Sequence, residues 1–104
     1  MTEWVDVGLE KDCPQGQRIV VDTDAGKVGV FHLSQGFYAI EDRCSHDNGE
    51  LASGERDGDE IICPRHGARF CLLNGKALTP PAYEDIEVFD VRVHDGMIQI
   101  DIDN

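Results

Sequence analysis

The sequence predicts a small all-β fold with antiparallel strands. Apolar and polar residues alternate over short segments, turn residues separate these segments, and no long stretch has a helical period. We expect the sheets to pack as a sandwich or partial barrel. A chain of 104 residues has room for one core, so we expect a single domain over residues 1–104.

Three strands and their turns account for most of the first 41 residues. A first strand is expected at Glu3–Leu9 and a second at Gln17–Asp22. Lys27–Leu33 then alternates Val28, Val30 and His32 on one side with Gly29, Phe31 and Leu33 on the other. Turn residues at 24–26 and 34–36 make residues 17–41 a three-strand meander.

The second half contains shorter strands and a C-terminal hairpin. Glu60–Ile62 runs into Cys63, and Arg69–Leu73 is expected as a strand that ends before Asn74-Gly75. Asp85–Val93 and Met97–Ile102 form a hairpin across His94-Asp95-Gly96.

Two short motifs carry the chemistry of the chain. Cys44-Ser45-His46 and Cys63-Pro64-Arg65-His66 stand sixteen residues apart, and each combines a thiolate with an imidazole. This donor set suits zinc or an iron–sulfur cluster. Zinc pairs usually leave two to four residues between ligands, which the first motif does not. A centre with two irons does not require this spacing, because the cysteine and histidine of each motif then bind different metal atoms.

The two motifs resemble the cluster loops of Rieske proteins. Arg43-Cys44-Ser45-His46 is similar to the first loop, Cys63 through Phe70 to the second, and the resemblance extends from Trp4 to Ile102. It implies one [2Fe–2S] cluster per chain, with Cys44 and Cys63 on one iron and His46 and His66 on the other. It also implies a cluster-binding subdomain over about residues 41–73, inserted in a larger β base, and a covering loop at Pro80-Pro81.

The net charge of such a cluster indicates how its reduction potential compares with that of an all-cysteine cluster. Two ferric ions, two sulfides and two thiolates sum to zero, so an added electron meets less repulsion than in an all-cysteine cluster. Rieske potentials span roughly −150 to +300 mV. High-potential members carry a disulfide where this chain has Gly49 and Arg65, and hydroxyl donors where it has Ala68 and Phe70. We therefore expect a low potential.

The composition excludes several function classes. A net charge of −12 argues against nucleic-acid or anionic-membrane partners and favours a carrier that meets a basic docking face. Residues 1–4 have neither the basic start nor the apolar run of a signal peptide, and no apolar run is long enough to span a membrane. Free thiols suit a reducing cytosol, so we expect a cytoplasmic location. A disulfide-bonded fold is the alternative use of four cysteines, but we expect Cys13 and Cys71 to be spare thiols.

Four arginines lie in the segment that carries the motifs: Arg43, Arg56, Arg65 and Arg69. They could guide docking or stabilise the added electron. Equally, they could be surface residues paired with Asp42, Asp47 and Glu60. His32 and His94 are expected to have structural or solvent-exposed roles.

The sequence contains no catalytic apparatus, so no catalytic residue is expected and the chain is predicted not to be an enzyme. It resembles the small monomeric Rieske ferredoxins that pass electrons, through transient contacts, from a flavin-dependent reductase to an aromatic-ring-hydroxylating terminal oxygenase. Alternatives are a stand-alone Rieske protein of another redox or iron–sulfur assembly pathway and the small subunit of nitrite reductase. A zinc-bound interaction module is the alternative from a different class.

Overall fold

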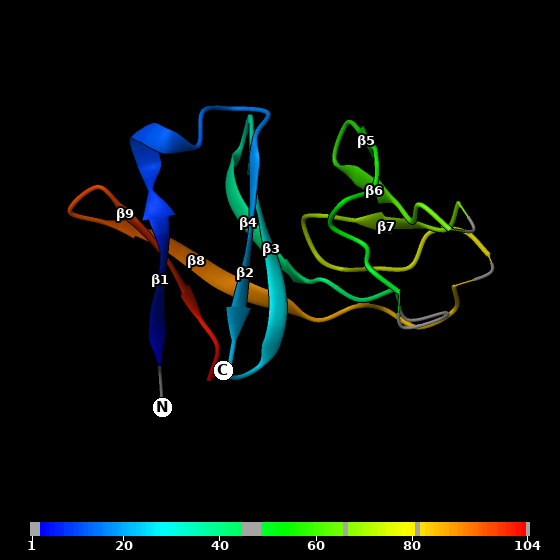
Figure 1. Cartoon of the computed structure of the whole chain (residues 1–104). Helices are drawn as coiled ribbons and strands as arrows, with labels where there is room; N and C mark the ends of the chain where they lie inside the picture. The colour runs from blue at the N-terminus through cyan, green and yellow to red at the C-terminus, as the bar shows by residue number, and fades with distance from the viewer. Residues whose placement is uncertain (1–2, 45–48, 66, 81, 104) are drawn as a thin grey trace.

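Six antiparallel strands form the base of the molecule (Figure 1). The computed structural model describes residues 3–44, 49–65, 67–80 and 82–103. The base sheet has the order β1-β9-β8-β4-β3-β2. The strands are β1 (Trp4–Leu9), β2 (Arg18–Thr23), β3 (Gly26–Leu33), β4 (Gly36–Glu41), β8 (Val88–His94) and β9 (Met97–Asp101). Because β1 also approaches β2, the sheet nearly closes into a barrel, which confirms the predicted fold class.

The interior of the base is filled by alternate side chains from its strands. We call this group the first core; its buried members are Cys13, Val28, Val30, Ala39, Phe89, Ile98 and Ile100. Partly buried residues of β1 and β2, among them Val5 and Ile19, pack against it. The alternation that predicted the strands therefore marks their inward faces.

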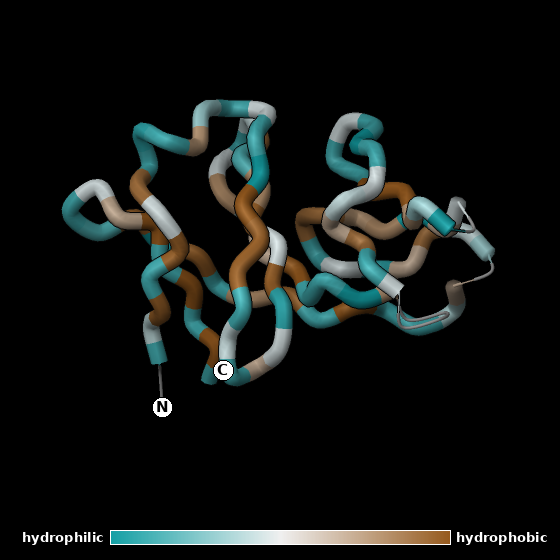
Figure 2. Tube along the Cα trace, viewed as in Figure 1, coloured by the Kyte–Doolittle hydropathy of each residue, from teal (hydrophilic) through white to brown (hydrophobic). Residues whose placement is uncertain are grey.

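A smaller sheet of three short strands lies beside the base (Figure 1). It pairs β5 (Arg56–Asp57) with β6 (Glu60–Ile62), and β6 with β7 (Arg69–Cys71). Apolar residues lie along the strands of both sheets (Figure 2).

A second core joins the two sheets. Its members come from β3, β4, the short strands and the loops around them: Phe31, Leu33, Ile40, Cys44, Leu51, Ala52, Ile61, Cys63, Ala68, Phe70, Leu72, Ala82 and Ile86. Strands β3 and β4 thus bury one face in each core, whereas the sequence alternation alone indicated only that their two faces differ.

The predicted meander and C-terminal hairpin are both confirmed. At the hairpin turn, Asp95 and Gly96 have φ of 52° and 79°, the positive values that a two-residue turn of this hand requires. Strand β7 ends at Cys71 rather than at the expected Leu73, because the chain turns there and Gly75 N–H donates to the Cys71 carbonyl at 2.8 Å. Strand β8 starts at Val88 rather than at Asp85, since the preceding residues Ala82 and Ile86 pack into the second core.

Two short elements were not predicted. The 3₁₀ helix η1 (Glu10–Asp12) follows β1, and β5 is only two residues long. Neither is long enough to produce a periodic pattern. Within the described residues, no helix has the length and apolar character needed to cross a membrane.

Among the described glycines, Gly54 leaves the least room for a side chain, because it packs against the end of β6. A Cβ atom at this position would overlap the carbonyl oxygen of Ile62, and would also come within 3.2 Å of the Leu51 carbonyl oxygen. Both obstacles are backbone atoms, which cannot rotate away. The residue type at position 54 therefore sets how closely the segment after Ala52 lies against β6.

We predict that Gly54→Ala destabilises the protein by about 1–3 kcal/mol, because the added methyl forces these backbones apart. Gly8→Ala is the matched control, since its Cβ would meet only the flexible end of Ile19 at 3.2 Å. Denaturant unfolding monitored by circular dichroism measures both. Equal stability losses in the two variants would contradict the prediction.

Candidate metal centre

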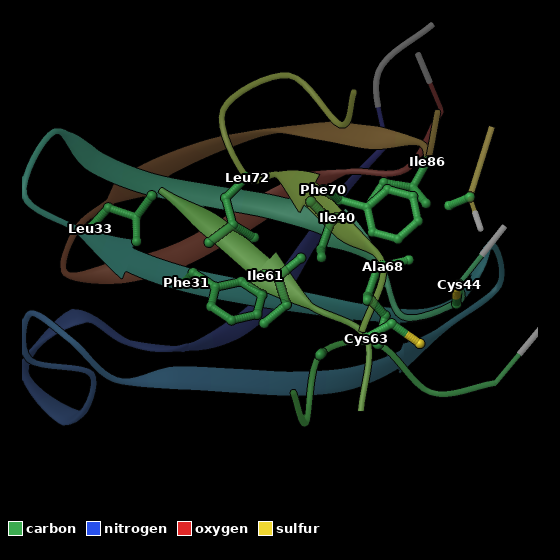
Figure 3. Close-up of a cluster of buried hydrophobic side chains, with 13 residues drawn as sticks. Phe31, Leu33, Ile40, Cys44, Ile61, Cys63, Ala68, Phe70, Leu72 and Ile86 are labelled. Carbon is green, nitrogen blue, oxygen red and sulfur yellow. The ribbon is translucent and has the colours of Figure 1, made fainter. Parts of the chain in front are cut away.

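The two motif cysteines lie together in the second core. Cys44 follows β4 and Cys63 follows β6, and their exposed fractions are 0% and 1%. Figure 3 shows both at one end of the cluster of buried side chains, with Leu33 at the opposite end. Two elements far apart in sequence therefore bring their thiols to one place.

Backbone hydrogen bonds close each cysteine loop on itself. Cys44 N–H donates to the Gly49 carbonyl at 2.9 Å. Cys63 N–H donates to the Ala68 carbonyl at 2.7 Å, and Gly67 N–H donates back to the Cys63 carbonyl at 3.0 Å. Gly67 has a φ of 74°, a conformation that glycine adopts without strain. Both thiols are thus held by short, internally bonded loops.

The donor chemistry of this pair fits an iron–sulfur cluster. Cysteine thiolates are the ligands that iron–sulfur clusters use, and two of them at one place would supply the two sulfur ligands of one iron. The other two predicted ligands, His46 and His66, lie outside the described residues. Among the residues that are described, no alternative group of three or more His, Cys, Asp or Glu side chains is placed to hold a metal ion.

A third segment lies against β7, next to the second cysteine loop. Arg69 N–H donates to Thr79 Oγ1 at 3.0 Å, and Leu78 N–H donates to the Arg69 carbonyl at 2.8 Å. The expected covering loop follows this segment. Pro80 is exposed, whereas Pro81 lies outside the described residues.

The two remaining cysteines occupy different environments. All four cysteines are free, so the disulfide-bonded alternative does not hold. Cys13 is buried in the first core, where burial raises the pKa of its thiol. Its carbonyl lies 2.8 Å from His32 Nδ1, and the His32 ring stacks on Phe37 at 4.0 Å between centroids. Cys71 is half-buried at the end of β7.

Arg43, Arg56 and Arg69, which lie near the motifs, each contact a neighbouring group. Arg69 Nη1 contacts Asp57 and Glu60 at 2.9 and 3.2 Å, and these hydrogen bonds raise the pKa of Arg69. Arg43 lies 3.6 Å from Glu41, and Arg56 donates to the Gly58 carbonyl at 3.2 Å. For these three, the structure favours surface pairing over free docking charges.

Sequence analysis missed two side chains that shape the first loop. Asp42 was considered only as one of several acids with which the arginines could pair. In the structure its Oδ1 accepts the N–H groups of Leu51 and Ala52 at 2.8 and 2.6 Å. Arg18 was not singled out at all. Its Nη1 donates to the carbonyls of Ala52 and Gly54, both at 2.6 Å. An arginine in an alternating strand gives no sequence signal that separates such a role from simple exposure.

Comparison with known proteins gives consistent matches over most of the chain. The family model for the Rieske [2Fe-2S] domain matches residues 3–90. The 3-phenylpropionate/cinnamic acid dioxygenase ferredoxin subunit of Shigella flexneri serotype 5b is 40% identical over 92 residues, covering 88% of this chain and 86% of that protein.

Solved structures agree with this family match. A chain in the complex of reduced oxygenase and oxidised ferredoxin in carbazole 1,9a-dioxygenase superposes with a TM-score of 0.87 at 31% identity, covering 94% of this chain and 92% of its own length. The ferredoxin of carbazole 1,9a-dioxygenase from Nocardioides aromaticivorans gives 0.86 at 28% identity, with coverages of 93% and 95%.

We predict that Cys44→Ser and Cys63→Ser each abolish iron and sulfide binding, whereas Cys71→Ser retains both. The half-buried Cys71 is the matched control because it undergoes the same atomic change on the strand that follows the second loop. Iron and acid-labile sulfide analysis after purification measures the effect. Retention of the full content by either motif variant would contradict the ligand assignment.

Proposed function

This chain belongs to the Rieske [2Fe-2S] domain family, and we propose that it is a one-electron carrier ferredoxin with no catalytic activity of its own. Its cofactor is a [2Fe–2S] cluster, which when bound supplies one reversible one-electron redox centre. In this proposal Cys44 and Cys63 bind one iron, and His46 and His66 bind the other. The burial of both cysteine thiols in a single core supports the assignment.

The proposed electron acceptor is a terminal oxygenase of the aromatic-ring dioxygenase type. The observation that carries this proposal is the 40% identity, over 88% of the chain, to a protein named as a dioxygenase ferredoxin subunit. A similar solved structure comes from a complex between a ferredoxin and an oxygenase, which supports the same kind of partner.

The proposed electron donor is a flavin-dependent reductase, and the chain acts as a cytoplasmic monomer that meets donor and acceptor in turn. A carrier with two partners must release each one, so both contacts are transient. The net charge of −12 favours partners with basic docking faces, to which the carrier is steered over a distance.

Metal analysis and electron transfer together test this function. We expect purified protein to contain iron and acid-labile sulfide in equal amounts and to develop a paramagnetic signal after one-electron reduction. The reduced protein should then be reoxidised by a terminal oxygenase more slowly as ionic strength rises, because salt screens the attraction. Stoichiometric zinc without sulfide would instead identify an interaction module and overturn the proposal.

The proposed potential is low within the Rieske range. Ala68 and Phe70 are both fully buried in the second core with Cys63, and neither side chain has a hydroxyl that could donate to a cluster sulfur. Fewer donors leave the reduced, more negative state less stabilised.

We predict that Ala68→Ser and Phe70→Tyr each raise the reduction potential, because each supplies the missing hydroxyl. A net hydrogen bond of about 1 kcal/mol corresponds to about 40 mV for one electron. Ala39→Ser is the control, since it buries the same hydroxyl in the first core. Protein-film voltammetry measures all three, and an unchanged potential in both test variants would contradict the low-potential explanation.

A further inference from the structure

Arg18 extends from the base sheet to the segment 51–54. It lies on β2, and its Nη1 donates to the Ala52 and Gly54 carbonyls at 2.6 Å each. Its guanidinium also stands 5.1 Å from the centre of the Phe31 ring, a cation–π contact. One side chain therefore connects a base strand, the second core and the loop that precedes β5.

Asp42 holds the same segment through its amide groups. The carboxylate accepts the Leu51 and Ala52 N–H groups, while the Arg18 guanidinium takes the carbonyls of Ala52 and Gly54. Ala52 also packs closely on β3, since a Cβ at Gly29 would stand only 2.7 Å from the Ala52 Cβ. This contact further restricts the position of the segment. The N–H groups of the segment thus bind a carboxylate, and its carbonyls bind a guanidinium. Hydrogen bonds that involve a charged group are stronger than those between neutral groups.

The clamped segment connects the two cysteine loops. Leu51 and Ala52 lie in the second core with Cys44, a few residues along the same loop. Gly54 packs under the carbonyl of Ile62, and Ile62 N–H donates to the Glu55 carbonyl at 2.9 Å. Ile62 directly precedes Cys63, and Gly54 and Cys63 line a common hollow of about 390 Å³. A displacement of 51–54 would therefore move Cys63 relative to Cys44.

The environment of Arg18 is consistent with a structural use of its charge. The pKa of Arg18 is lowered mainly by burial and secondly by repulsion from Arg56. Both hydrogen bonds go to neutral carbonyls, which serve as acceptors for a guanidinium that is partly removed from water.

We propose that Arg18 is a positioning residue that holds segment 51–54 so that Cys44 and Cys63 keep the separation required by the cluster. This inference rests on the proposed function, because it assigns both cysteines to one cofactor. The role belongs to a residue 26 positions before Cys44 in the sequence, outside the cluster-binding motifs. Its loss should weaken cluster retention as the loss of other supporting residues around metal sites does, by roughly tenfold or more.

Three variants of the cluster-loaded protein test the proposal. Arg18→Met removes the donors and the charge but keeps an unbranched stem, and Arg18→Lys restores the charge on a shorter reach. Arg92→Met is the matched control: Arg92 lies on β8 over the Trp4 ring, 4.1 Å from its centre, and bonds Gln99. We expect Arg18→Met to lose its visible absorption under chelator about tenfold faster than wild type, Arg18→Lys to be intermediate, and Arg92→Met to match wild type.

Two further readouts separate positioning from general stability. Hydrogen exchange should accelerate at the Leu51, Ala52 and Gly54 amides in Arg18→Met while the Val28 and Val30 amides stay protected. The paramagnetic spectrum of the reduced cluster should also broaden or shift in this variant, and return toward wild type in Arg18→Lys.

Equal cluster lifetimes in Arg18→Met and Arg92→Met would overturn the proposal, as would exchange that rises equally in both cores. If Arg18→Met does not fold, Arg18→Lys decides: a wild-type lifetime together with wild-type exchange overturns the role. A wild-type protein that bound no iron–sulfur cluster would instead reject the proposed function itself.

Discussion

Burial of β3 and β4 on both faces is the constraint from which the rest of the structure follows. Val28, Val30 and Ala39 fill the first core, while Phe31, Leu33 and Ile40 fill the second. A shift of one residue in register would exchange these two sets of side chains. The ladder from Val28↔Glu41 to Leu33↔Gly36 holds the register, and Cys44 comes three residues after β4 ends. The position of the first motif cysteine is therefore tied to how the base strands pair.

The three-stranded sheet and the loops around it depend on the base for their shape. Its strands are two or three residues long, too short to be stable alone, and its apolar residues pack on Phe31, Leu33 and Ile40. The loops are further held by backbone bonds within each cysteine turn and by Arg18 and Asp42 around segment 51–54. A metal centre bound by such loops would add its binding energy to the folding of a small domain.

Local sequence patterns were sufficient to predict the strands of the base. They were insufficient where tertiary packing determines a strand end or the role of a side chain. Alternation and turn residues predicted the meander and the Asp95-Gly96 hairpin, and the two motifs predicted the cofactor class. The end of β7 at Cys71 and the late start of β8 depend on turns and core contacts distant in sequence. Arg18 and Asp42 could not be predicted, because each acts on backbone atoms, and carbonyl or amide groups carry no residue signature.

The pairing of β1 with β9 brings the two ends of the chain together. Trp4 stands opposite Asp101, and Figure 1 shows β1 and β9 separated from β5–β7 by strands β2, β3 and β4. The second core, with Cys44 and Cys63, contains no residue of β1 or β9 among the described residues. A linker, affinity tag or electrode tether joined at either end would therefore be attached to strands that do not contribute to the core around Cys44 and Cys63. This geometry makes the chain a suitable module for fusion to a redox partner.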